Sequence, residues 1–340
     1  MGSIPIGSTI FKSMDYVFTS LENRDTRWFK YLIANAGYRP FGMPKLDISN
    51  KDVHQRYPID YDFILEYYIK RFGITATYNN ILPQVNKFYE RLVIQFREGD
   101  SIISTNSGEW PSRTLSEIAK VKKVKFLYFE NFYFSKRFQL SSKPFTDSKF
   151  GSPEFHEIYK QTASYTKEDE AFLEDYISNK KTKYMNEQGT EPIVEEYDWF
   201  VVGQVDYDTN IILLDKGKLQ TSDDLCYDLA IKNPDKRILY KQHPAEKKLN
   251  IVLKQLPNVR IVTSNLYDIF AKTKEVHTIS STVGIEAQLN SVPVVWHSNT
   301  HIAEIDLLNK ENQLRFINAA LKYSFKGLKE NMLTKVTKYF

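Results

Sequence analysis

The chain has 340 residues, of which 42% are hydrophobic and 26% charged, enough to bury two cores of ordinary size. Its 46 basic and 42 acidic side chains give a net charge of +4 and are spread along the whole length, which excludes the concentrated basic stripe of a nucleic-acid-binding protein. A single cysteine, Cys226, excludes an internal disulfide and favours a reducing compartment, and its helical surroundings predict a buried thiol. No apolar run approaches the length of a membrane span and no signal peptide is recognisable, so we expect a cytoplasmic protein.

The first half of the chain alternates strand-like and helical patterns, and the helical ones tend to end at glycine. In chain order we expect a strand at 15–21, helices at 24–37, 60–73 and 84–99, a strand at 101–105, a helix at 112–121 and a strand at 124–130. This alternation is typical of a parallel sheet covered by helices.

A long polar loop at 132–152 and a charged helix at 167–184 lead to a predicted linker. We place a domain boundary near residue 190, which divides the chain into an N-terminal α/β domain, 1–190, and a C-terminal α/β domain, 191–340. In the second half, five short β-rich runs alternate with helical patterns and predict a doubly wound sheet. These runs are at 198–205, 237–242, 259–264, 275–280 and 292–298.

Asp206 and Asp208 lie two positions apart in the stretch VVGQVDYDTNI, just after the first of these runs. Three uses are compatible with that spacing: a D-x-D clamp for a divalent metal, a carboxylate that attacks a sugar, or an ordinary acidic turn. The carboxyl ends of the strands form the edge at which open α/β sheets bind ligands. We therefore expect the loop to border a binding site.

Lys241 and His243 end the next predicted strand, and Pro244 behind them suits the first turn of a helix. Positive side chains beside a helix N-terminus favour a phosphate, because the exposed N–H groups and the helix dipole add to their charge. The alternative is a solvent-exposed turn with one hydrogen-bonded histidine.

Ser280, Ser281 and Thr282 open a helix predicted for 282–289. Their hydroxyls and backbone N–H groups suit an anion, although one hydroxyl is expected simply to cap the helix. Gly284 would let a ligand approach the helix closely. Glu286 follows Thr282 by one helical turn, where its carboxylate would accept hydrogen bonds from ribose hydroxyls.

Glu130 and Asn131 end the last strand predicted in the first half. A carboxylate among aromatic side chains tends to keep its proton, which suits a general acid or base. The alternative is a rim residue paired with a basic side chain. Asn131 and Arg113 are candidates for contacts with a sugar or an acceptor.

Several common signatures are missing from the sequence. His297 and His301 lie four apart, but the residues between them do not favour a helix, so we expect no metal pair there. No Cys/His cluster suited to zinc, Walker loop, G-x-G-x-x-G fingerprint or G-x-S-x-G elbow occurs. Kinase, dehydrogenase and serine-hydrolase interpretations therefore lack their main sequence signals.

Taken in order, YFEN, GQVDYDTNI, KQHP and SSTVGIEA resemble the bacterial capsule polysaccharide biosynthesis family, whose members include retaining β-Kdo glycosyltransferases. The resemblance covers roughly residues 100 to 300 and is strongest between 199 and 296. It implies two Rossmann-like domains facing a cleft, as in GT-B glycosyltransferases. The C-terminal domain would bind the donor, CMP-Kdo, and the acceptor glycan would enter over the N-terminal domain.

The resemblance also implies roles for individual residues. In the retaining members, an aspartate four residues after a glutamine is the nucleophile, which matches Asp208 after Gln204. Glu130 matches the family's glutamate before asparagine, the general acid/base, and His243 matches the histidine at the leaving phosphate. One departure is Gln242, where relatives often carry proline. Donor binding would involve Gln204, Lys241, Ser280, Ser281, Thr282 and Glu286.

We therefore expect a glycosyltransferase that moves Kdo from CMP-Kdo to a bacterial surface polysaccharide, with retention through an aspartyl-sugar intermediate at Asp208. Lys241 and His243 already supply positive charge, and CMP carries a single phosphate, so we expect no metal and no cofactor. Asp206 would then shape the loop. The alternatives are a CMP-sialic-acid-dependent sialyltransferase, a UDP-sugar epimerase, or a non-catalytic glycan-binding or assembly protein of the capsule machinery.

The expected partners are a CMP-sugar donor and a glycan or lipid-linked glycan acceptor, without nucleic acid. The C-terminal stretch 325–340 is basic and amphipathic, so it is a candidate for peripheral contact with the inner membrane. The interpretation that we favour is that this stretch packs back across the domains.

Overall fold

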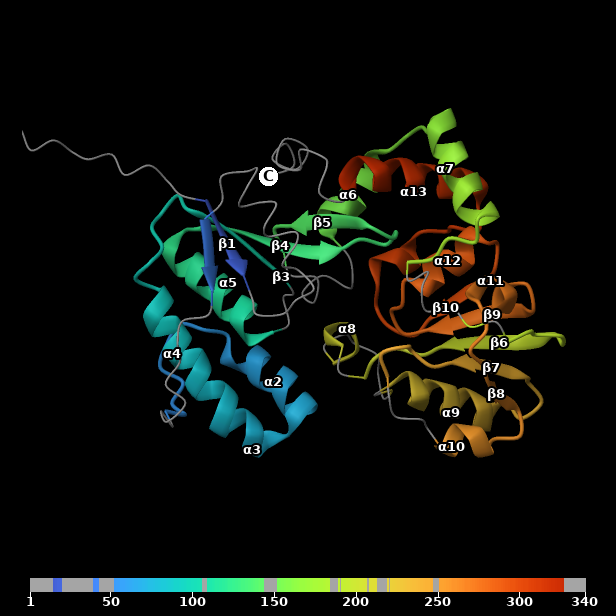
Figure 1. Ribbon diagram of the computed structural model, residues 1–340, viewed down its shortest axis with the longest axis horizontal. Coiled ribbons are helices and arrows are strands. Elements are labelled where there is room, and N and C mark those ends of the chain that lie inside the picture. The colour runs from blue at the N-terminus through green and yellow to red at the C-terminus, as the bar shows by residue number, and fades with distance from the viewer. Residues whose placement is uncertain are drawn as a thin grey trace, which may run out of the picture.

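The computed structural model contains two β-sheets, each flanked by helices and set side by side (Figure 1). It describes residues 15–19, 39–42, 52–105, 109–143, 152–183, 189, 191–206, 208–212, 219, 221–246 and 251–326. The helix predicted at 24–37, and the candidate membrane segment after residue 326, lie outside the described residues.

The first sheet is mainly parallel. Its strands are β1 (Asp15–Thr19), β2 (Arg39–Gly42), β3 (Ser101–Thr105), β4 (Lys125–Asn131), β5 (Arg137–Ser141) and β11 (Phe325–Lys326). They are arranged in the order β11-β5-β4-β3-β1-β2, with β5 and β11 antiparallel to their neighbours. The helices of this half are α2 (Tyr61–Phe72), α3 (Ile74–Ala76), the π-helical turn η1 (Thr77–Ile81), α4 (Leu82–Leu92) and α5 (Trp110–Lys122).

The strands and helices predicted for the described part of the first half are confirmed, with shifted ends, but the prediction of an uninterrupted loop at 132–152 was wrong. Residues 137–141 form β5, which pairs with β4. The rings of Phe129 and Phe138 stack across this pair with centroids 5.2 Å apart. A short polar segment such as RFQLS becomes a strand because a neighbouring strand supplies its hydrogen bonds and an apolar face.

The second sheet is entirely parallel. Its strands are β6 (Tyr197–Val202), β7 (Ile238–Lys241), β8 (Val259–Ile261), β9 (Thr273–Thr278) and β10 (Val294–Trp296). Their order is β10-β9-β6-β7-β8. The chain adds β7 and β8 on one side of β6 and then crosses over to add β9 and β10 on the other side. The predicted doubly wound sheet is confirmed, and its topological switch point lies between β6 and β9. The helices here are α8 (Thr209–Ile212), α9 (Ser222–Lys232), α10 (Ile251–Gln255), α11 (Leu266–Phe270) and α12 (Val283–Leu289).

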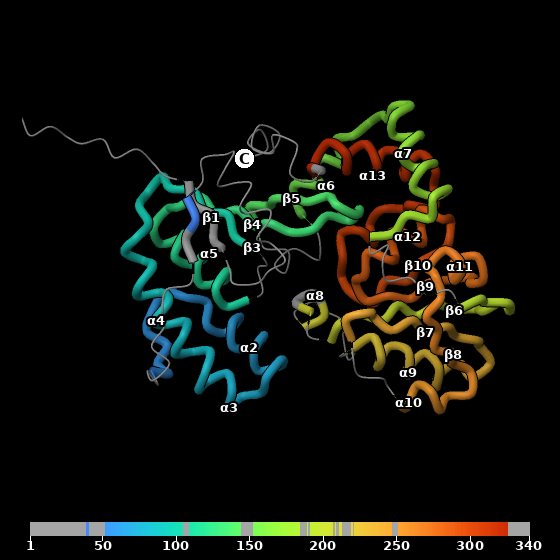
Figure 2. The backbone as a smooth tube through the Cα atoms, in the orientation of Figure 1, coloured from blue at the N-terminus to red at the C-terminus, as the bar shows by residue number. Residues whose placement is uncertain are grey.

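A third group of helices joins the two halves. It comprises α6 (Pro153–Gln161), α7 (Lys167–Ser178) and α13 (Lys310–Tyr323), preceded by the 3₁₀ turn η4 (His301–Glu304). Helix α13 packs against α6 and α7 (Figure 2), and β11 then adds a strand to the first sheet. An aromatic cluster built around Phe132, Phe155 and Phe316 fills the space between these helices and also receives Ile285 of α12. The chain therefore crosses between the halves a second time near its end.

Two further properties bear on the expectations from sequence. Cys226 is fully buried in α9, as predicted, and burial raises the pKa of its thiol far above the usual range. Within the described residues, none of the helices has the length and apolar character required to cross a bilayer.

Candidate active site

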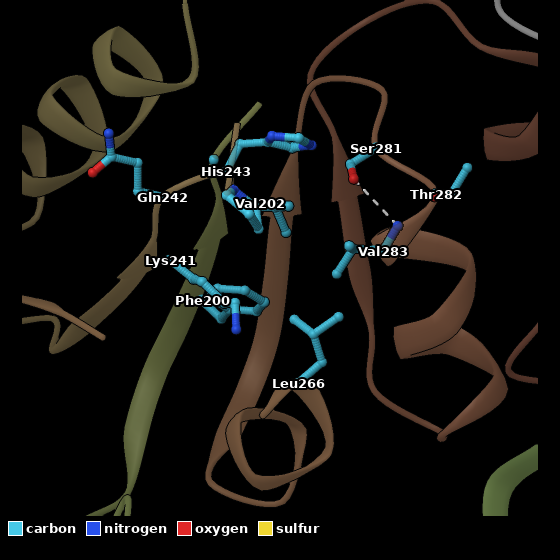
Figure 3. Close-up of a pocket in the computed structure, with 11 residues that line it drawn as sticks. Phe200, Val202, Lys241, Gln242, His243, Leu266, Ser281, Thr282 and Val283 are labelled. Carbon is cyan, nitrogen blue, oxygen red and sulfur yellow. Dashed lines mark hydrogen bonds between the residues drawn. The ribbon is translucent and has the colours of Figure 1, made fainter. Parts of the chain in front are cut away.

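A pocket of about 60 Å³ lies at the carboxyl ends of β6 and β7, beside the start of α12 (Figure 3). This volume has room for several water molecules or one small ligand group. His243 and Ser281 lie toward one end of the pocket, and the apolar side chains of Phe200 and Leu266 lie toward the other. Its lining comprises Phe200, Val202, Gly203, Lys241, Gln242, His243, Pro244, Leu266, Ser281, Thr282 and Val283.

The pocket depends on close packing of the loops after β6 and β7. A Cβ atom on Gly203 would lie 2.5 Å from the carbonyl oxygen of Lys241, so only glycine fits there. Gly284 plays a different part from the one expected: a Cβ atom there would meet the ring of Trp296 at 2.5 Å. Gly284 therefore makes room for a side chain of this protein.

Gln204 connects the loop after β6 to the turn after β9. Its Oε1 accepts hydrogen bonds from the backbone N–H of Ser280, at 3.0 Å, and from the hydroxyl of Thr278, at 3.2 Å. Its Nε2 donates to Oγ of Ser280 at 3.2 Å, and its own N–H donates to Ser222 at 2.8 Å. The hydrogen bonds between Gln204 and the buried Ser280 therefore fix the position of the turn before α12, which borders the pocket.

Ser281 and Thr282 line the pocket, as the sequence predicts for a donor site. Oγ of Ser281, one residue before the N-cap position, accepts a hydrogen bond from the N–H of Val283, the first residue of α12, at 3.2 Å (Figure 3). The side chain of Thr282, although at the N-cap position, makes no capping hydrogen bond. Its hydroxyl is therefore the better placed of the two to meet a ligand.

His243 and Lys241 both line the pocket, but their polar atoms have different surroundings. Nδ1 of His243 accepts a hydrogen bond from the N–H of Ala245 at 3.1 Å, so the neutral ring carries its proton on Nε2 and can donate from there. Nζ of Lys241 donates to the backbone carbonyls of Thr263 and Ser264 at 3.2 and 2.5 Å. Burial lowers the pKa of Lys241. Its ammonium group is thus engaged with the loop after β8.

The three described residues at 244–246 do not form the first helical turn that the sequence predicts behind His243. Residues 243–246 form a turn, closed by a 2.9 Å hydrogen bond from the N–H of Glu246 to the carbonyl of His243. The next helix among the described residues is α10, Ile251–Gln255. Proline is common both in turns and at the first position of a helix, so the local sequence could not distinguish a turn from a helix start at Pro244.

Asp208 lies on the surface at the start of α8, and Asp206 is exposed in the preceding turn. The N–H of Asp208 donates to the carbonyl of Val205 at 2.9 Å, and its own carbonyl accepts from Ile211 and Ile212. Nζ of Lys70, in the first half, donates to the carbonyl of Ile212 at 3.2 Å. The loop that carries Asp208 is therefore tied to both halves of the molecule.

Glu130 and Asn131 lie at the carboxyl end of β4, in the first sheet, and neither lines the pocket. Both are half-buried, and Oε1 of Glu130 accepts a hydrogen bond from the N–H of Asn131 at 2.9 Å. Asn131 in turn accepts from Gln139 of β5 through its carbonyl, at 3.3 Å. Their predicted roles in catalysis and acceptor binding stay predictions.

Glu286 and Arg113 are both buried away from the pocket. Oε1 of Glu286 accepts from the N–H of Lys183, at 2.8 Å, and from the hydroxyl of Tyr176, at 3.3 Å. The guanidinium of Arg113 forms an ion pair with Asp60 at 3.0 Å and is 4% exposed. Contacts of these two residues with a ribose or an acceptor remain predictions, and they would require these side chains to be uncovered.

The apolar part of the pocket was missed in the sequence. Phe200, Val202 and Leu266 form it, and Thr278 helps to hold Gln204. Phe200 and Val202 alternate along β6, which identifies one face of a strand, but nothing local indicates that this face borders a pocket.

The family model of capsule polysaccharide biosynthesis proteins matches residues 112–304, more than half of the chain. The chain belongs to this family. All the candidate residues of this capsule polysaccharide biosynthesis protein lie within the matched span, and the resemblance seen in its motifs is confirmed. A search of curated proteins found no match to the sequence.

Two solved structures support the fold assignment. The chain is similar to the β-Kdo 2,7 transferase KpsC of Thermosulfurimonas dismutans, with a TM-score of 0.58, 13% identity, and coverage of 93% of this chain and 92% of the other. It is also similar to the β-Kdo 2,4 transferase KpsC of the same organism, with a TM-score of 0.55, 14% identity and 94% coverage of each. At such identities the similarity concerns the fold, and the expected GT-B-like architecture of two Rossmann-like halves is confirmed.

Proposed function

We propose that this protein is a glycosyltransferase that moves the keto-acid sugar Kdo from CMP-Kdo to a polysaccharide acceptor of the bacterial surface. The observation that carries the proposal is the pocket at the switch point of the second sheet, in a chain of this family. Asp208 follows β6 and His243 follows β7 at that edge, where open α/β sheets bind ligands. The fold shared with two β-Kdo transferases is consistent with this choice of sugar.

The proposed reaction has two displacements. A carboxylate oxygen of Asp208 attacks the anomeric carbon of Kdo and CMP leaves, which forms an aspartyl-sugar ester. The acceptor hydroxyl then attacks the same carbon, Glu130 takes its proton, and the carboxylate of Asp208 is released. Two inversions give net retention, as in retaining glycosidases.

The leaving phosphate develops negative charge as its bond to the sugar breaks. The proton on Nε2 of His243 and the hydroxyl of Thr282 are the donors that we assign to it, because both residues line the pocket. Donors aimed at developing charge stabilise the transition state more than the ground state. CMP carries one phosphate, so we assign no metal ion to this step, and added Mg²⁺ should leave the rate unchanged.

Incubation with CMP-Kdo followed by intact-protein mass spectrometry tests the proposal. We expect an adduct of the mass of one Kdo residue, mapped to Asp208 by proteolysis and lost in Asp208→Asn. Asp206→Asn is the matched control and should retain the adduct. An adduct elsewhere, or one that persists in Asp208→Asn, would reject the nucleophile.

A panel of donors tests the sugar. CMP-Kdo should be hydrolysed or transferred, whereas CMP-sialic acid and UDP-sugars should not. Turnover of CMP-sialic acid alone would establish a sialyltransferase, and turnover of a UDP-sugar without an acceptor would establish an epimerase. Failure to bind any of these donors would indicate a non-catalytic protein.

A further inference from the structure

His156 of α6 meets His301 and Glu304, which lie on η4 well over a hundred residues later in the chain. Nε2 of His156 lies 3.4 Å from Oε2 of Glu304, and Nδ1 of His301 lies 4.0 Å from Oε1 of the same carboxylate. One donor atom from each of the three side chains lies within 4.8 Å of the other two. The two imidazole rings stack, with centroids 4.9 Å apart. No other group of three such side chains within the described residues comes as close together.

The backbone of both segments holds these side chains in place. In a 3₁₀ turn, residues three apart eclipse one another, so His301 and Glu304 project from the same side of η4. Ile302 lies between these two residues and Ile305 follows them. Both isoleucines are buried in the aromatic cluster, with exposures of 1% and 3%. Phe155, the neighbour of His156, is 1% exposed in the same cluster. The donor atoms are therefore carried by two segments anchored in one core.

The chemistry of the three groups favours a cation over an ion pair alone. One carboxylate can balance one imidazolium, but two protonated rings stacked together would repel each other. Two neutral imidazoles and a carboxylate form instead a nitrogen and oxygen donor set that Zn²⁺ binds well. Donors of a tetrahedral zinc site lie about 3.4 Å apart, given bonds of about 2.1 Å. The 3.4 and 4.0 Å contacts are to different oxygens of Glu304, and one ligand atom from each residue lies within 4.8 Å of the other two. Binding one ion through a single carboxylate oxygen therefore requires the ligand atoms to close by up to about 1.4 Å, which side-chain rotation can supply.

We propose that His156, His301 and Glu304 bind one Zn²⁺ ion, with Nε2, Nδ1 and a carboxylate oxygen as ligands and water in the fourth position. Glu304 has a side-chain exposure of 48%, which leaves a path for the ion and room for the water. The ion would join α6 to the segment that follows β10, and so clamp the helical group onto the second sheet. This site is separate from the pocket at β6 and β7, and its proposal does not depend on the proposed transferase reaction.

Zinc titration of the full-length protein, stripped of metal with a chelator, tests the site. In competition with a chromogenic zinc indicator we expect one tight site per chain, and elemental analysis after gel filtration should find one zinc. Co²⁺ in the same site should give the strong visible absorption of a four-coordinate ion. Bound zinc should raise the melting temperature by a few degrees.

Variants identify the ligands. Glu304→Gln and His301→Gln should each weaken zinc binding at least about tenfold and abolish the rise in melting temperature. Glu304 is exposed, so Glu304→Gln should remove a zinc ligand without unfolding the protein. Circular dichroism of the variant checks that the fold is kept. Glu157→Gln, on the exposed face of the same α6, is the matched control and should bind zinc normally.

A second histidine pair is the competing candidate for zinc binding. Nδ1 of His277 and Nε2 of His297 lie 3.0 Å apart, and the other nitrogen of His277 contacts Glu275 at 2.9 Å. If His297→Gln removed the zinc while Glu304→Gln retained it, the proposed site would be wrong. Absence of any tight site in the unaltered protein would equally overturn it.

Discussion

Ile211 and Ile212 are neighbours in the chain but are buried in different cores. Ile211 is 1% exposed and belongs to the cluster on the second sheet that contains Val201 and Leu225. Ile212 is 6% exposed and belongs to the cluster of the first half that contains Tyr67 and Phe88. Helix α8 therefore docks the loop that carries Asp208 against both halves (Figure 1).

Truncation of Ile212 should loosen this docking. Ile212→Ala removes buried methyl groups at the contact and should lower the free energy of unfolding by about 2 kcal/mol or more. It should also slow transfer, because the loop with Asp208 loses one of its two anchors. Thermal unfolding and steady-state kinetics measure the two effects. Ile231→Ala, at a side chain 54% exposed on α9, is the control, and an equal loss of activity in that variant would contradict the docking role.

Gln204 should act on donor binding through the turn before α12. Gln204→Leu keeps the approximate volume but leaves the buried N–H of Ser280 without its acceptor, which costs about 1–3 kcal/mol. We expect the KM or Kd for the CMP-sugar to rise at least about tenfold as Ser281 and Thr282 shift. Gln95→Leu, an exposed glutamine of the first half, should leave donor binding unchanged. Unchanged donor affinity in Gln204→Leu would exclude this role.

The carboxyl group of Glu286 should make the free energy of unfolding of the protein decrease as the pH rises from about 4.5 to about 7. Burial raises the pKa of its carboxyl to about 7, from 4.5, and Oε2 has no hydrogen-bond partner among the described residues. Between these two values the folded protein keeps a proton that the unfolded chain releases. The contribution to stability is therefore complete below about pH 4.5, falls through the interval, and is lost above about pH 7.

Glu286→Gln imitates the protonated carboxyl at every pH. The stability of this variant relative to the unaltered protein should grow as pH rises from about 4.5 to 7, by up to about 3 kcal/mol, and then stay constant. Chemical denaturation at several pH values measures the difference. Glu174→Gln, at an exposed position of α7, should show no such trend. A flat difference for Glu286→Gln would mean that its carboxyl titrates normally in the folded protein.

Glu130 should affect the second displacement more than the first. Glu130→Gln cannot take the acceptor proton, so transfer should slow by about 10²- to 10⁴-fold while the aspartyl-sugar adduct accumulates. Rapid-quench mass spectrometry with CMP-Kdo and acceptor follows the adduct. Glu98→Gln, at an exposed ion pair with Lys123, is the control. Normal turnover in Glu130→Gln would remove this residue from the mechanism.

The sequence predicted features that depend on local spacing. Apolar runs such as those in β6 and β9, and the glycine after α2, identify strands and helix ends because backbone geometry repeats over a few residues. From the alternation of these elements the doubly wound sheet followed, and with it the edge that bears Asp208 and His243. The pocket lies at that edge because parallel strands carry their loops to the same side of a sheet.

Only the tertiary structure decided where the side chains near that edge point. Lys241 turns to the carbonyls of Thr263 and Ser264, and the carboxylate of Glu286 is buried against α7. The hydrogen-bond partners of Lys241 and Glu286 are at least 22 positions away in the sequence. A pattern of neighbouring residues cannot predict such partners. The same applies to the meeting of His156 with His301 and Glu304, because it depends on how α6 packs beside η4. Sequence spacing determined which residues share a sheet edge, whereas burial and long-range packing determined their hydrogen-bond partners.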